Sequence, residues 1–151
     1  MTATQQPDPF ESDAGAVKGP SGPRAGFWRR FAASFLDGVV ITLVSTPFAA
    51  IDVAAYYAVS FFGQAVYYTL LEGGSRGQTL GKRALGIRVV DLAGGGPIGY
   101  ERGFIRWIGR FASGIVLLLG YLWMLWDREK QTWHDKMAGS VVVPVGSVPV
   151  D

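Results

Sequence analysis

The chain has 151 residues, enough for one compact unit, and 49% of them are apolar. The net charge is +2, and the basic residues stand beside apolar runs, which argues against a nucleic-acid partner and favours lipid head groups. The absence of cysteine excludes disulfides, thiol catalysis and thiolate metal sites.

The first segment, residues 1–26, is polar and carries prolines and acidic residues. It lacks the basic start and apolar stretch of a signal peptide. We therefore predict a disordered N-terminal tail that lies in the cytoplasm.

The first strongly apolar run covers residues 31–50 and follows an anchor of aromatic and arginine side chains at residues 27–30. A helix rises about 1.5 Å per residue, so this run spans roughly 30 Å, the thickness of the hydrocarbon core of a bilayer. The run contains one formal charge, Asp37. We predict a transmembrane helix with an acid inside it.

The Asp37 carboxylate costs about 2.5–3.5 kcal/mol at such a position by insertion scales, so it needs a partner or a task. Arg30 lies two turns earlier on the same face, about 10 Å away along the axis, which is too far for an ion pair. Candidate partners are Arg106, Arg110 and Gln64, or a proton. Asp37 either exchanges protons in a transport pathway or pins helix packing, and both interpretations stay open.

The second apolar run, residues 53–71, has no formal charge, and the short connection that precedes it has no lysine or arginine. Positive charge favours the cytoplasmic side of a membrane. We therefore predict a second transmembrane helix, antiparallel to the first and joined to it on the outer face.

A polar stretch rich in glycine and basic residues follows, residues 72–102. Alternating apolar residues within 84–91 predict a short strand, and the glycines after it predict a turn. We expect a small β element at the membrane surface, beside a basic loop that includes Lys82, Arg83 and Arg88.

The glycines of this loop do not form a phosphate-binding motif. A Walker A loop would need a glycine at Arg76 and a serine or threonine at Arg83. We therefore predict no nucleotide site.

The third apolar block, residues 107–126, has an uncharged part of only about 24 Å as a helix, short for a span. It crosses the membrane if Arg106 and Arg110 extend to the interface. Alternatively, residues 101–110 form an amphipathic surface helix, or the block enters and returns. We predict a third span, although residues 140–143 look like a strand whose natural partner lies before the block.

The chain has a single histidine, His134, which cannot form a zinc site alone. No independent arrangement of serine, histidine and aspartate is present. We predict no enzymatic activity, no cofactor and no metal, with His134 at the interface or, as an alternative, in a proton relay with Asp135.

Four pieces of the sequence together resemble the RDD family of small membrane proteins, named for one arginine and two aspartates. They are Arg30-x-x-Ala33-x-x-x-Asp37, GQTLGKR at residues 77–83, IRVVD at 87–91 and WHDKMAGSVVV at 133–143, which includes Asp135. The resemblance implies a membrane domain over residues 27–143, followed by a C-terminal tail at 144–151. It also implies a transport role, including cation/proton exchange, as has been suggested for some members.

The sequence therefore predicts an all-α polytopic protein of a bacterial-type plasma membrane, with about three spans and a small β element. The first hypothesis is an ion- or proton-coupled transporter or transporter component. In it, Asp37 binds the ion or proton, Arg30 sets its field or fixes the interface, and Asp135 acts at the membrane mouth. The second hypothesis is a non-catalytic scaffold or assembly subunit that binds partner proteins or anionic lipid. The expected partners are the bilayer and either a second copy of the chain or another membrane protein.

Overall fold

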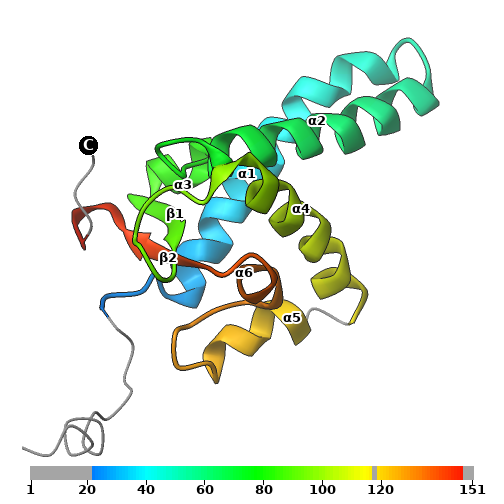
Figure 1. Ribbon diagram of the computed structural model, residues 1–151. Helices are drawn as coiled ribbons and strands as arrows, with labels where there is room; N and C mark the ends of the chain where they lie inside the picture. The colour runs from blue at the N-terminus through cyan, green and yellow to red at the C-terminus, as the bar shows by residue number, and fades with distance from the viewer. Residues whose placement is uncertain (1–21, 117–118, 148–151) are drawn as a thin grey trace, which may run out of the picture.

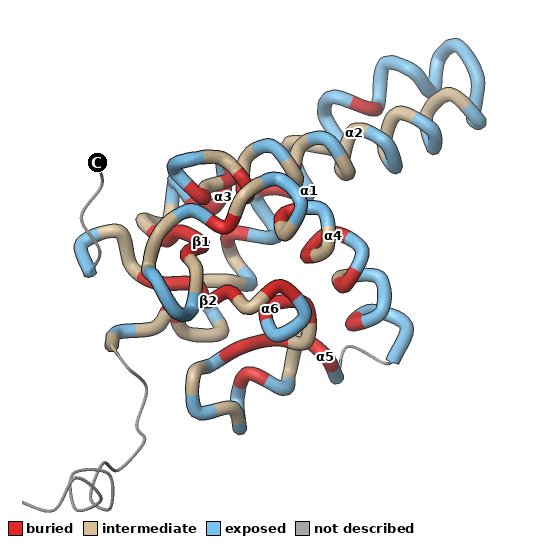
Figure 2. The backbone as a smooth tube through the Cα atoms, in the orientation of Figure 1, coloured by how far each residue is buried: buried red, intermediate tan, exposed pale blue. Residues whose placement is uncertain are grey.

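The two apolar runs form a long antiparallel helical hairpin in the computed structural model, which describes residues 22–116 and 119–147. The helices are α1 (Phe27–Ala49) and α2 (Val53–Gly73). Their far halves project beyond the rest of the molecule (Figure 1), and most of the residues there are exposed (Figure 2). Asp52 begins α2, because its carboxylate accepts a hydrogen bond from the Ala54 amide at 3.2 Å.

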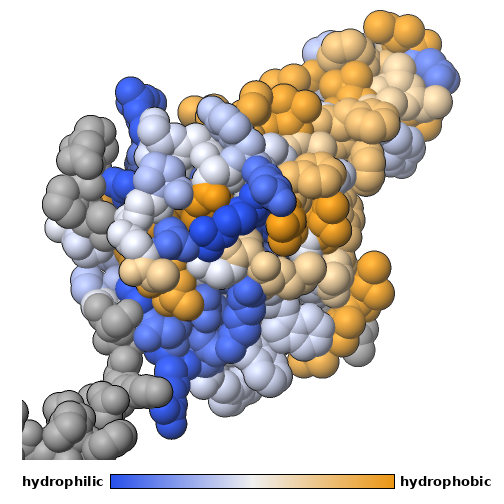
Figure 3. Space-filling model, viewed as in Figure 1, coloured by the Kyte–Doolittle hydropathy of each residue, from blue (hydrophilic) through white to orange (hydrophobic). Residues whose placement is uncertain are grey.

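The surface of this hairpin is apolar, as Figure 3 shows in orange at its projecting end. Leu43 is 68% exposed and Ile51 at the tip is 76% exposed. Such a surface is unusual for a protein in water and suits a lipid environment. Within the described residues, α1 is the helix that qualifies by itself as a membrane span on length and composition. α2 is also long enough, but it does not meet the same hydropathy criterion, and it contains four tyrosines and Gln64.

A small two-stranded sheet lies at the base of the hairpin (Figure 1). Strand β1 (Ile87–Asp91) pairs antiparallel with β2 (Ser140–Pro144), with Val89 opposite Val142. Both strands fall within segments predicted to be extended. The sheet is joined by the short helix α3 (Leu80–Ala84) before it and the 3₁₀ turn η3 (Val145–Ser147) after it.

The end of the predicted N-terminal tail belongs to this body. Ala25 is buried, and its amide donates a hydrogen bond to the Val142 carbonyl at 2.9 Å. The rest of the predicted disordered tail, residues 1–21, lies outside the described residues.

The predicted third span, residues 107–126, is not one helix. The chain forms α4, α5 and the 3₁₀ helix η2, and α4 is bent by 112° from the α5–η2 pair. Because β1 precedes this block and β2 follows it, strand pairing brings both ends of the block to the same side of the molecule. Three membrane spans are therefore not confirmed. The elements are α4 (Gly99–Ile115), α5 (Leu119–Leu122), η2 (Trp123–Leu125) and α6 (Trp133–Met137).

Helix α4 turns its charged side inward and its apolar side outward. Arg106 is 1% exposed, whereas Ile115 is 80% exposed. The expected extension of Arg106 to the interface is therefore wrong, because its guanidinium finds buried carboxylates instead. The outward side is an apolar stripe made of Phe104, Ile108, Phe111 and Ile115.

Two glycines allow α4 to cross closely over the end of α2. A Cβ atom on Gly103 would lie 2.9 Å from the Thr69 carbonyl oxygen, and one on Gly73 would lie 2.7 Å from the Gly99 carbonyl oxygen. The backbones are therefore in contact at this crossing, which fixes the position of the adjacent side chains of α2 and α4.

We expect Gly103→Ala to destabilise the fold by about 1–3 kcal/mol, because the added methyl group forces the two backbones apart. Thermal unfolding of the purified protein in detergent measures the effect. The matched control is Gly114→Ala on the same helix, where an added Cβ meets nothing within 4 Å. This control should be neutral or stabilising, since alanine favours a helix over glycine by about 1 kcal/mol. Equal loss in both variants would show that the close crossing is not required.

Candidate functional site: a buried charge cluster

Glu72, at the end of α2, is fully buried and lies among three cations. Its carboxylate accepts hydrogen bonds from Lys82 Nζ at 2.7 Å and from Arg106 Nε at 2.9 Å, and it also pairs with Arg110. The partners come from α3 and α4, so a single carboxylate ties three helices together. A buried carboxylate is tolerated only when it is paired in this way.

Asp135, in α6, is the second fully buried carboxylate of the cluster. Arg30 Nη1 donates to its Oδ2 at 2.6 Å, and Arg106 Nη1 donates to its Oδ1. The Thr132 amide also donates to Oδ2 at 3.0 Å, which closes the first turn of α6. Arg106 therefore bridges Glu72 and Asp135, and the same Nη1 reaches Ser140 on β2.

Burial by itself would raise the pKa of Asp135, but Arg106 and Arg30 hold that pKa well below its ordinary value. Because the folded-state pKa is lowered, the carboxylate is more strongly acidic in the folded protein than in the unfolded chain. Its stabilising effect is complete above the ordinary pKa of about 3.9 and is lost only as the pH falls through the lower folded-state value. The ion pairs of Asp135 thus persist at neutral and mildly acidic pH.

Asp37 is also fully buried, but its partners are uncharged. It accepts hydrogen bonds from Tyr67 Oη at 2.8 Å, from Thr79 Oγ1 at 2.6 Å and from the Gly81 amide at 2.8 Å. A Cβ atom on Gly81 would lie 2.1 Å from the Ala33 carbonyl oxygen. Asp37 therefore fastens α1 against the beginning of α3 in a contact that only glycine permits.

The three partners expected for Asp37 from the sequence are not those in the structure. Arg106 and Arg110 form ion pairs with the Glu72 carboxylate, and Arg106 also pairs with Asp135. Gln64 lies with Arg110 on the wall of a cavity. The physical reason is that Asp37 already receives three hydrogen bonds, which satisfy a buried carboxylate without a cation.

The basic loop expected at the membrane surface is largely internal. Lys82 is 5% exposed and pairs with Glu72, and Arg88 on β1 is also buried. Of the three residues predicted there, Arg83 is the exposed one. Burial lowers the pKa of Lys82, and the neighbouring Glu72 carboxylate opposes that effect.

His134 is buried within the protein, so it does not present its ring on the molecular surface. Its Nε2 lies 3.0 Å from Thr132 Oγ1. Burial lowers the pKa of His134 well below its ordinary value, which keeps the ring neutral at physiological pH. Its 3.8 Å separation from Asp135 is therefore not an ion pair between charged groups under those conditions.

The site brings together side chains that are far apart in the sequence and were not predicted to contact each other. It brings Arg30 to Asp135, and it leaves Asp37 next to the cluster with its own set of donors. Glu72 was missed, although it is the only formal charge in an otherwise uncharged second helix. Within residues 22–116 and 119–147, no group of three or more histidine, cysteine or acidic side chains is arranged to hold a metal ion.

Comparison with known proteins matches residues 24–139 to the model of the family described as the RDD family. The uncharacterized membrane protein YteJ of Bacillus subtilis is 30% identical, over 88% of this chain and 92% of that protein. YxaI of the same organism is 29% identical, over 79% of this chain and 96% of its own length. The proline-rich antigen homolog of Mycobacterium tuberculosis is 29% identical over 77% of this chain, and this chain spans only 61% of its length. No solved structure matches the chain.

We expect Glu72→Gln to destabilise the fold by about 3–5 kcal/mol, because it leaves buried cations without their counter-charge. Chemical or thermal unfolding in detergent measures the loss. Glu101→Gln is the matched control, because Glu101 is exposed on the first turn of α4, and it should change stability by less than about 0.5 kcal/mol. If Glu72→Gln leaves the stability unchanged, Glu72 is not the centre of the cluster.

Proposed function

We propose that this chain, which belongs to the RDD family and is a membrane protein, acts as a non-catalytic membrane scaffold. The observation that carries the proposal is that Asp37, Glu72 and Asp135 are each 0% exposed and each held by donors from other segments. These buried contacts hold helices and strands together, and they do not resemble a site that exchanges ions with water.

The three carboxylates have a clear structural role. Glu72 joins α2 to α3 and α4, Asp135 joins α6 to α1 and α4, and Asp37 joins α1 to α3. Together these contacts hold the hairpin rigidly on the body made by the sheet and short helices. Such a rigid base would present the hairpin to the bilayer and the body to a partner.

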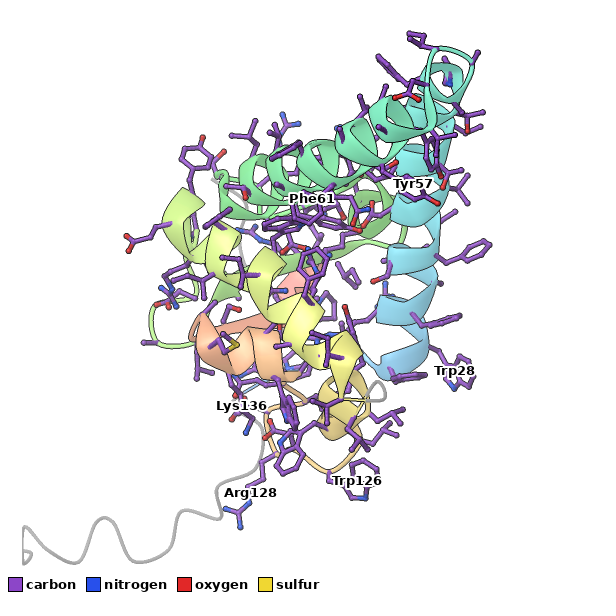
Figure 4. The ribbon with its side chains drawn as sticks, turned by 90° about the vertical axis from the view of Figure 1, so that its right-hand side faces the viewer. Trp28, Tyr57, Phe61, Trp126, Arg128 and Lys136 are labelled. Atoms are coloured by element: carbon purple, nitrogen blue, oxygen red, sulfur yellow. The ribbon has the colours of Figure 1, made fainter. Side chains whose placement is uncertain are left out.

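The proposed topology has two crossings, formed by α1 and α2, with the tip of the hairpin on the outer side. The body, with α4 and α5 at its edge, lies at the cytoplasmic interface. Trp28 and Trp126 are 77% and 74% exposed and lie at the end away from the tip (Figure 4). Arg128 and Lys136 lie at the same end, while the tip has no basic residue. Aromatic rings at the interface and positive charge on the inner side support this orientation.

A scaffold role also agrees with the length of the mycobacterial relatives, of which the matched region is only part. The partners we propose are the bilayer and either a second copy of the chain or another membrane protein.

Ion- or proton-coupled transport, the first hypothesis from the sequence, has less support. Asp37 has no exposed surface, and Tyr67 and Thr79 cover its carboxylate. A transport role would require these donors to leave in turn so that water could reach the acid. In that role Asp37 would bind the ion or proton, Arg30 would set the charge near it and Asp135 would act at the membrane mouth.

The variant Asp37→Asn separates the two functions. The amide oxygen can keep the hydrogen bonds from Tyr67 and Gly81, and the amide nitrogen can donate to Thr79 Oγ1. We expect the variant to fold with a loss of about 0.5–2 kcal/mol. In liposomes with a pH-sensitive dye and imposed Na⁺ or K⁺ gradients, neither the wild type nor the variant should move protons.

Asp37→Leu is the companion variant, because it leaves the same three donors without an acceptor and should lose the fold. Cation-dependent proton flux by the wild type, abolished in a folded Asp37→Asn protein, would contradict the scaffold and establish transport.

The absence of native cysteine makes the topology directly testable with single cysteines at Ile51, Ser75 and Lys136. We expect a membrane-impermeant maleimide to label position 51 from outside the cell and positions 75 and 136 only after the inner face is opened. Labelling of 75 and 136 from opposite sides would show that the third apolar block crosses the membrane.

A further inference from the structure

We infer that a cavity between α1, α2, α4 and α5 binds a phosphate-bearing anion. The cavity has a volume of about 210 Å³. Ser34 lies on its α1 wall, Gln64 and Tyr68 on its α2 wall, and Trp107 and Arg110 on its α4 wall. It is separate from the carboxylates of the charge cluster but shares Arg110 with it.

Two residues of the α4 wall each carry a buried donor atom that the described residues do not satisfy. Arg110 uses Nη2 to pair with Glu72, while its buried Nη1 has no hydrogen-bond acceptor among them. The buried indole Nε1 of Trp107 also has none, and that side chain is 7% exposed. An unsatisfied buried donor is unfavourable by about 1–3 kcal/mol, so a ligand in the cavity whose acceptor reached either of these atoms would be stabilised.

The local charge favours an anion as that acceptor. The cations of the cluster outnumber its carboxylates. There are four cations, Arg30, Lys82, Arg106 and Arg110, and three carboxylates if Asp37 is counted with Glu72 and Asp135, which leaves a net charge of +1. Among the described residues, those that line the cavity include no carboxylate.

Arg110 is also held in place for this task. The centre of its guanidinium lies 3.8 Å from the centroid of the Tyr68 ring, in a cation–π contact. A planar guanidinium fixed on an aromatic ring keeps little freedom to lose on binding, and its fork geometry matches phosphate oxygens.

The size and position of the cavity narrow the ligand. Its volume lies below the range of about 300–1,000 Å³ typical of drug-sized ligands, so it suits a small charged group. Phe111 on its rim is 43% exposed on the apolar outer side of α4. The ligand is therefore a phosphate-bearing group with a net negative charge, from either an anionic phospholipid or a soluble phosphate. The inference rests on the membrane placement in the proposed function and adds the ligand to it.

The test is titration calorimetry on the full chain in a neutral maltoside detergent. The probes are short-chain phosphatidylglycerol, short-chain phosphatidylcholine and inorganic phosphate. We expect saturable binding of phosphatidylglycerol at least tenfold tighter than that of phosphatidylcholine. Binding should weaken at least tenfold in Arg110→Gln and stay unchanged in Arg83→Gln, which removes the same charge from an exposed position.

A second pair of variants protects the test from loss of the fold. Ser34→Phe fills the cavity from the opposite wall and alters no ion pair, so it should also weaken binding at least tenfold. Ala49→Phe adds the same bulk at an exposed position near the far end of α1 and should leave binding unchanged.

If phosphatidylglycerol binds and its binding depends on Arg110 and Ser34, the ligand is a lipid head group. If inorganic phosphate binds as tightly and with the same dependence, the ligand comes from a soluble source. The inference would be overturned if neither phosphatidylglycerol nor inorganic phosphate binds, or if the two lipids bind equally. It would also be overturned if neither Arg110→Gln nor Ser34→Phe changes the binding. None of these results depends on proton flux. The inferred ligand of the cavity and the proposed scaffold role can therefore be disproved independently.

Discussion

The structure depends on the burial of one guanidinium, that of Arg106. It lies between the Glu72 and Asp135 carboxylates at 1% exposure, and it reaches Ser140 on β2. A buried charge is tolerated only when its partners are present in good geometry, so this arginine requires the ends of α2, α6 and β2 to meet at one point. Arg30 and the other cations are then arranged around the two carboxylates. A buried polar cluster therefore lies beside the apolar core of the sheet, while apolar side chains cover the hairpin outside it.

Charge and hydropathy in the sequence were sufficient for the hairpin and for the identity of several buried residues. Both long helices, both strands and RDD family membership were predicted and are confirmed. Partner choice could not be read in the same way. Asp37 is satisfied by Tyr67, Thr79 and a backbone amide, and neutral donors leave no signal in a charge pattern. Glu72 looked like the first residue of a polar loop, although α2 continues through it.

The third apolar block shows why hydropathy alone misleads here. Counting apolar residues says how much of a segment prefers lipid, but not which side of a helix carries the preference. In α4 the arginines share one side and face inward, while Phe104, Ile108 and Phe111 face outward. A helix of this kind can lie along an interface with its charges hidden in protein and its apolar side in lipid. The 112° bend after it, together with strand pairing, then returns the chain to its starting side.

The pairing of β1 with β2 has a consequence for the order in which the chain can be completed during synthesis. The ribosome releases β1 long before β2, and residues 92–139 must emerge between them. During that interval β1 has a free edge and the buried valines of the sheet lack their cover, a state that invites pairing with other chains. Closure of such a distant contact is slow compared with helix formation. The protein therefore stays vulnerable to aggregation and proteolysis until its last strand is made, and a chaperone or the bilayer surface would be most useful at that stage.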